Sequence, residues 1–157
     1  MRTQQWWLWA VLALTGCGGG TSAAPAKTSS DSGAGPGAPN IPWEQKNHDQ
    51  RLEWMGLEVF PKMKEAFQAY DEAEFKDFKC QTCHGDDMKE VNFKMPNKLP
   101  ALEKENTFAA AQAYDAEAAA FMGETVAPTM AKLLGMDLYN ADTGKGFGCF
   151  GCHPTNE

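Results

Sequence analysis

The chain has 157 residues with 14 basic and 21 acidic side chains, which gives a formal net charge of −7 and an isoelectric point near 5.0. Nucleic-acid binding needs a basic face that displaces counterions, so this charge argues against a nucleic-acid partner. An aromatic content of 11% argues against a disordered acidic tail. The five cysteines cannot all pair as disulfides within one chain, so at least one thiol has another role.

The N-terminus reads as an export signal, predicted for residues 1–16. Trp6–Leu14 is an unbroken run of nine apolar residues after a positively charged start at Arg2. A run of this length suits a signal peptide and is too short to span a bilayer. It ends in Leu14-Thr15-Gly16-Cys17, an apolar residue and two small residues before a cysteine.

This tetrapeptide resembles the lipobox of bacterial lipoproteins. The resemblance implies cleavage before Cys17, acylation of Cys17 and anchoring to a lipid bilayer without spanning it. Some inner-membrane lipoproteins carry Asp after the lipidated cysteine, and Gly18 at that position favours the outer membrane by analogy. The alternative is an ordinary signal peptide with an incidental cysteine.

Residues 17–42 are predicted to form a lipidated N-terminus and a flexible tether, because the segment consists mainly of Gly, Ser, Ala, Pro and Thr. Residues 43–157 are then the folded domain.

Two pentapeptides in this domain contain the remaining four cysteines and two of the three histidines. Cys80-Gln81-Thr82-Cys83-His84 and Cys149-Phe150-Gly151-Cys152-His153 both read Cys-x-x-Cys-His, the attachment pattern of c-type haem. Two thiols three positions apart on a helical turn can reach the two vinyl groups of one porphyrin, and the adjacent His then faces the iron. The chain therefore resembles a dihaem c-type cytochrome with two covalently bound haem c groups.

Other uses of four cysteines explain the pattern less well. Structural zinc ribbons place their Cys-x-x-Cys pairs about 15–20 residues apart, against more than 60 here. Two disulfides or a thioredoxin-like redox pair would not explain a His after both second cysteines. An exported chain also suits haem attachment, which happens outside the cytoplasm.

The distal ligands are predicted from an internal repeat. Only four residues follow His153, so its haem needs a ligand from upstream, from another chain or from solvent. The pattern aromatic-Met-Gly-x-x-Val-x-Pro-x-Met occurs at 54–63 and again at 121–130, and each copy is followed by a haem motif 17 to 19 residues later. The repeat thus ties Met63 and Met130 to the haem motifs that follow them.

A helix-borne methionine before each Cys-x-x-Cys-His resembles the cytochrome subunit of photosynthetic reaction centres and related multihaem lipoproteins. The resemblance covers roughly residues 43–157 and implies that Met63 and His84 ligate one iron and that Met130 and His153 ligate the other. This chain has two units where that subunit has four haems, so the family's partner is not carried over.

Alternative distal ligands remain open at this point, and core packing is the ordinary role of a helical methionine. Met55 and Met122 repeat equally well. Met95 precedes a proline, as in monohaem cytochromes, and has no counterpart in the second unit. His48 is the one histidine outside the two motifs and could give one haem two histidine ligands.

The expected fold is all-α with little or no sheet, built from two helix–haem-motif units at about 47–102 and 107–157. Helices are predicted at 49–59 with Asn47 as N-cap, around the methionine of each repeat, and at 107–123. Pro61 and Pro128 either open their helices or kink longer ones, and poor caps before them favour a kink. Segments 85–102 and 140–148 are predicted loops, with Phe93, Leu99 and Leu102 lining the first haem pocket.

Two closed six-coordinate haems favour electron transfer between extracytoplasmic redox proteins or with a membrane redox complex, and no catalytic residue is predicted. The alternatives are a small dihaem peroxidase or reductase, a gas sensor with one open haem site, or a subunit of a larger membrane complex.

Overall fold

The structure is a computed structural model that describes residues 41–156. The predicted signal peptide, Cys17 and nearly all of the predicted tether lie outside the described residues. The described part is helical, and its only β-type pairings are isolated bridges, which confirms the all-α prediction. The helical segments are η1 (Trp43–Gln45), α1 (His48–Trp54), η2 (Met55–Val59), α2 (Phe60–Tyr70), α3 (Cys80–His84), α4 (Thr107–Tyr114), α5 (Ala116–Phe121), η3 (Met122–Val126), α6 (Ala127–Leu134) and η4 (Cys149–Gly151).

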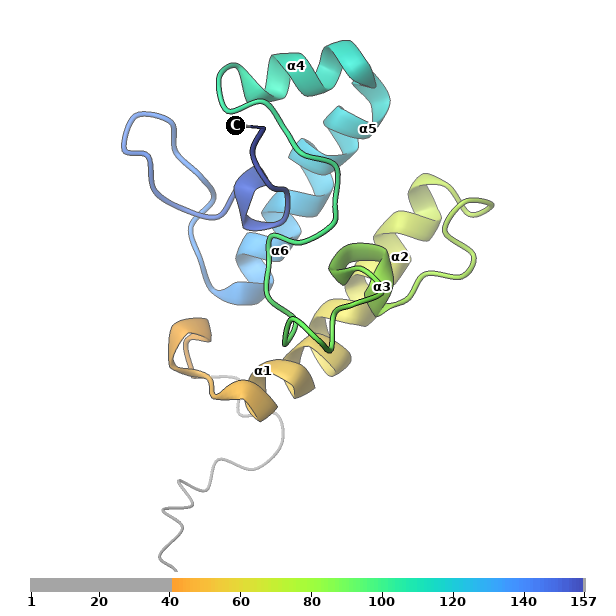
Figure 1. Ribbon diagram of the computed structural model, residues 1–157, viewed down its shortest axis with the longest axis vertical. Helices are drawn as coiled ribbons and strands as arrows, with labels where there is room; N and C mark the ends of the chain where they lie inside the picture. The colour runs from red at the N-terminus through yellow and green to blue at the C-terminus, as the bar shows by residue number, and fades with distance from the viewer. Residues whose placement is uncertain (1–40, 157) are drawn as a thin grey trace, which may run out of the picture. The chain divides into compact units, whose positions relative to one another are not determined.

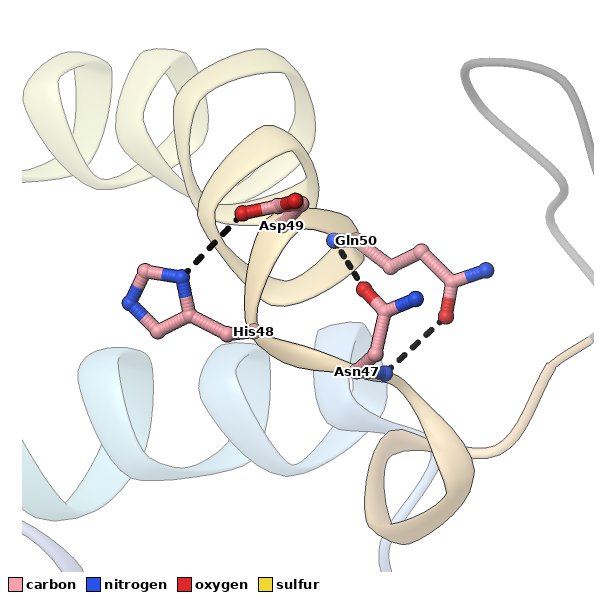
Figure 2. Close-up of polar contacts among 4 residues, drawn as sticks. All are labelled: Asn47, His48, Asp49 and Gln50. Carbon is pink, nitrogen blue, oxygen red and sulfur yellow. Dashed lines mark hydrogen bonds and ion pairs between the residues drawn. The ribbon is translucent and has the colours of Figure 1, made fainter. Parts of the chain in front are cut away.

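The segments α1, η2 and α2 follow one another without a break, and we call them the first rod (Figure 1). Asn47 caps the rod as predicted. Its side chain accepts a hydrogen bond from the Gln50 backbone N–H at 2.9 Å, and the Gln50 side chain accepts one from the Asn47 N–H at 3.0 Å (Figure 2). This reciprocal pair satisfies two donors that a helix start would otherwise leave free.

A π-helical turn interrupts the first rod directly before Pro61. The Phe60 N–H donates to the Met55 carbonyl, one residue further back than in an α-helix. Proline cannot donate a backbone hydrogen bond, and its ring collides with the carbonyl four residues earlier in a regular helix. The wider turn accommodates the proline, so the helix runs through Pro61 rather than starting there.

The second rod consists of α5, η3 and α6, and it has the same π-helical turn before a proline. Its π turn lies at Met122–Val126, directly before Pro128 and 67 residues after the first, with the Ala127 N–H donating to the Met122 carbonyl. The rod ends at Gly135, whose φ of 67° provides the left-handed conformation of a helix C-terminus. The sequence repeat is therefore also a repeat of local backbone structure.

One helix boundary differs from the prediction of a single helix at 107–123. The chain breaks at Asp115, which has an extended conformation with φ −153°. The Asp115 carboxylate accepts a hydrogen bond from the Ala118 N–H at 2.9 Å and so caps α5. An aspartate that competes for backbone donors ends α4 and starts a second helix, despite the Ala-rich sequence on both sides.

The core lies where the two rods meet. Its buried residues are Val59, Met63, Phe67 and Phe78, and side chains from the second rod, among them Phe121 and Met130, pack against them. The Trp54 indole N–H also donates to the Leu133 carbonyl at 2.9 Å, which ties the rods together. Within residues 41–156 no large side chain is fully buried, so the polypeptide alone makes only a small core.

Candidate haem-binding sites

The first Cys-x-x-Cys-His motif forms the single helical turn α3. The Lys79 N–H donates to the Thr82 hydroxyl at 3.1 Å at the start of the turn, and Gly85 ends it with a φ of 78°. On such a turn Cys80, Cys83 and His84 lie within one helical repeat, because residues three and four apart are neighbours on a helix. This local structure agrees with the predicted geometry for haem attachment.

The His84 imidazole is partly buried against an aromatic ring. Burial lowers the pKa of His84 and so favours the neutral imidazole, the form that binds a metal. Its Nδ1 is buried and has no hydrogen-bond partner among the described residues. Such an orphaned polar atom costs free energy and is a feature that calls for a functional explanation.

Phe93 contacts His84 edge-on, with ring centroids 5.8 Å apart. The loop that carries it is strained, since Asn92 and Phe93 have φ values of 53° and 56°. A bulky side chain rarely adopts this left-handed conformation, and such strain persists only where the surrounding structure holds it. Phe93, which is predicted to line the first haem pocket, thus lies beside the His84 ring.

The second motif differs from the first in its backbone. Cys149–Gly151 forms a 3-10 turn rather than an α-helical one, with the Cys152 N–H donating to the Cys149 carbonyl at 3.1 Å, and the His153 N–H donates to the same carbonyl at 2.9 Å. The Phe147 ring packs over Gly151 so closely that an added Cβ would lie 2.7 Å from a ring carbon. Glycine at this position therefore leaves room for the Phe147 ring.

The His153 ring has a defined hydrogen-bond partner. Its Nδ1 lies 2.9 Å from the Pro100 carbonyl oxygen. A carbonyl can only accept, so Nδ1 is the donor, and in the neutral ring Nε2 keeps the lone pair that can bind iron. Metal-ligating histidines commonly make this kind of bond with their second nitrogen. Leu102, predicted to line the first haem pocket, pairs through its backbone with Pro154 and Asn156, which follow the second motif.

All four thiols of the two motifs are free of disulfides. Burial, followed by the nearby Cys152 and Cys80 thiols, raises the pKa of Cys83 to about 11. Burial and the Cys149 thiol also raise the pKa of Cys152.

The candidate methionines gather around the core of the two rods. Met63 is only 4% exposed and belongs to the core itself, while Met130 is partly buried and packs against it. Met55 and Met122 pack against the same core, as does Cys83 of the first motif. The structure therefore brings the favoured and fallback methionines to one cluster that borders the first haem motif.

The other two alternative ligands, His48 and Met95, do not belong to this core. The His48 side chain is half-exposed and its Nδ1 lies 3.3 Å from the Asp49 carboxylate (Figure 2). Its ring lies 6.5 Å from that of Phe93, so His48 and His84 both neighbour this phenylalanine. Met95 lies in the loop after the first motif and is partly buried.

Neither a metal cluster nor a membrane-spanning helix is found in the described residues. Across 41–156 no three His, Cys, Asp or Glu side chains meet in a way that could hold a metal ion. No helix in the same range combines the length and the apolar character needed to cross a bilayer.

The donor set nevertheless fits a c-type haem. Each motif supplies two unpaired thiols and one imidazole, and thioether methionines lie in the adjoining core. Sequence reasoning missed two residues of these sites, Asn97 and Pro100, which contact the two histidines from a loop. These contacts depend on the path of that loop through the fold, so no local sequence pattern could predict them.

Comparison of the chain with protein-family models found no match, and neither the curated proteins nor the solved structures gave one.

Proposed function

We propose that the chain is a membrane-anchored dihaem c-type cytochrome that transfers electrons between extracytoplasmic redox partners. The observation that carries the proposal is the pair of Cys-x-x-Cys-His motifs, in which all four thiols are unpaired. The small core of the polypeptide supports it too, because two covalently held porphyrins would add apolar volume that the side chains do not supply.

Each residue has a defined role in this proposal. Thioether bonds to Cys80 and Cys83 hold one haem, and bonds to Cys149 and Cys152 hold the other. His84 and Met63 would bind the first iron, and His153 and Met130 would bind the second. The bound haem supplies a one-electron couple between ferric and ferrous iron.

The protein's part is to fix the ligands and to tune their electronic character. A thioether opposite an imidazole favours ferrous iron and so raises the reduction potential relative to two imidazoles. The hydrogen bond from His153 Nδ1 to Pro100 makes that imidazole a stronger donor and opposes this effect at the second haem. With a histidine and a methionine on each iron, no position would be left for a substrate, which favours electron transfer over catalysis.

Spectroelectrochemical titration of the purified holoprotein with a carbon monoxide challenge tests the electron-carrier function. We expect two one-electron steps, low-spin spectra in both oxidation states and no rapid binding of carbon monoxide by the ferrous protein. Rapid carbon monoxide binding or peroxide turnover would contradict the proposal and would favour the peroxidase, reductase or gas-sensor alternative.

The anchor proposed at Cys17 predicts a large change in location for one substitution. Cys17→Ala should move the protein from the membrane fraction to the soluble extracytoplasmic fraction, because the acyl chains provide the membrane affinity, at about 0.8 kcal/mol for each buried methylene. Fractionation followed by mass spectrometry of the mature N-terminus measures both parts. An unacylated Cys17 in the wild-type protein, or unchanged membrane attachment of the variant, would refute the anchor.

A further inference from the structure

The loop 97–102 is attached to both haem motifs, and we call it the strap. We infer that the strap couples the two haem sites and that Asn97, although it contacts only the first motif, is a positioning residue for the second. This inference rests on the proposed function, because it concerns the two histidines that would bind iron.

The first end of the strap is held at His84. The Asn97 amide donates to the His84 carbonyl at 2.6 Å and to an Asp87 carboxylate oxygen at 3.1 Å. Lys98 forms an ion pair with the same carboxylate at 2.9 Å. The fit around Asn97 is tight, since a Cβ added at Gly85 would lie 3.2 Å from its amide nitrogen. The strap is thus fixed to the residues that directly follow the first cysteine pair.

The other end of the strap is held at His153. The Pro100 carbonyl accepts the hydrogen bond from His153 Nδ1 at 2.9 Å. Two residues later, the Leu102 N–H donates to the Pro154 carbonyl at 2.8 Å, and the Leu102 carbonyl accepts from the Asn156 N–H at 2.9 Å. These backbone bonds attach the strap at Leu102 to the residues on the C-terminal side of the second motif.

The two attachments are close together along the chain. Asn97 and Pro100 are three residues apart, and three extended residues span at most about 11 Å. A shift of Asn97 therefore moves the Pro100 carbonyl against His153, and a changed hydrogen bond at Nδ1 changes the donor strength of this ligand.

Asn97→Ala in the holoprotein tests the strap. The readouts are the reduction equilibrium of each haem and the proton NMR signals of the two imidazole Nδ1–H groups, with the His153 signal identified by its loss in a variant without the second haem. We expect both haems to respond, with a change of about tenfold in the reduction equilibrium of the second and a shifted His153 signal.

Asn156→Ala is the matched control. The Asn156 amide donates only to the exposed Glu103 carboxylate at 3.0 Å, so the variant loses one asparagine hydrogen bond near the second motif without releasing the strap. We expect this variant to change the reduction equilibrium of the second haem and the His153 signal less than Asn97→Ala does, although Asn156 lies three residues from His153. The reverse order would contradict the inference.

A response of the first haem alone to Asn97→Ala would also overturn the inference. Should that variant not yield holoprotein, Asn97→Gln replaces it, because one added methylene displaces the amide without removing it. We then expect smaller shifts at both haems, and a shift confined to the first haem refutes the strap. A wild-type protein without covalent haem would overturn the proposed function itself, and the two failures are therefore distinguishable.

Discussion

The double variant Cys149→Ala, Cys152→Ala should carry one haem per chain instead of two. In the proposed cytochrome both thioether bonds of the second haem depend on these thiols, and the other two cysteines of residues 43–157, Cys80 and Cys83, are assigned to the first haem. Intact-mass spectrometry and the haem content of the denatured protein measure this loss, which we expect to be about half of the covalent haem.

Cys80→Ala with Cys83→Ala is the matched control for that experiment. It should remove the first haem and leave the second, so the two variants should differ in which spectrum survives. Both should be less stable than the wild type, since each loses apolar cofactor volume from a domain with a small polypeptide core. Retention of both haems in either variant would refute attachment at that motif.

Met130→Ala should remove the second haem's contribution to the charge-transfer band from methionine to ferric iron that the proposed ligation predicts. Removing the thioether also lowers the reduction potential and opens an axial position, so the ferrous variant should bind carbon monoxide. Absorption spectroscopy of the ferric protein and a carbon monoxide titration of the ferrous protein measure these effects.

Met122→Ala is the matched control because Met122 lies at the other methionine position of the same repeat and packs against the same core. We expect the second haem's contribution to the band to survive in this variant. Survival of this contribution in Met130→Ala together with its loss in Met122→Ala would reassign the ligand. The pair Met63→Ala and Met55→Ala makes the same distinction for the first haem. Because Met63 is buried, we also expect Met63→Ala to lower the free energy of unfolding by about 2–5 kcal/mol.

The sequence predicts the local structure well where neighbouring residues determine it. Asn47 followed three residues later by Gln50 marks a helix start, and the structure has the reciprocal pair of hydrogen bonds there. The helices around Pro61 and Pro128 were expected to be opened or kinked by proline. The π turns that accommodate both prolines could not be predicted, because the choice between a kink and a wider turn depends on packing between the rods.

Asp115 shows why one helix prediction was wrong. Its flanks are rich in alanine, which favours a continuous helix, and the carboxylate of a single aspartate outweighs them by capping the second segment. The propensity of the surrounding residues is a weak signal, and a good cap in the middle of a helical stretch competes with it directly.

The residues of the candidate sites likewise divide into those that the local sequence predicts and those that only the fold reveals. The thiols and imidazoles follow from a pentapeptide, whose spacing alone gives their chemistry. The contacts of Asn97 with His84 and of Pro100 with His153 join residues 13 and 53 positions apart, so they depend on the path of a loop that no periodic pattern describes. The unpaired Nδ1 of His84 is likewise visible only once the burial of the ring is known.

The most direct test of the proposed cytochrome is the intact mass of the exported protein after denaturation and acid extraction of loosely held haem. The proposal predicts a chain that keeps the added mass of two haems and has no disulfide. A chain without haem, or one that has lost four hydrogens to two disulfides, would contradict it.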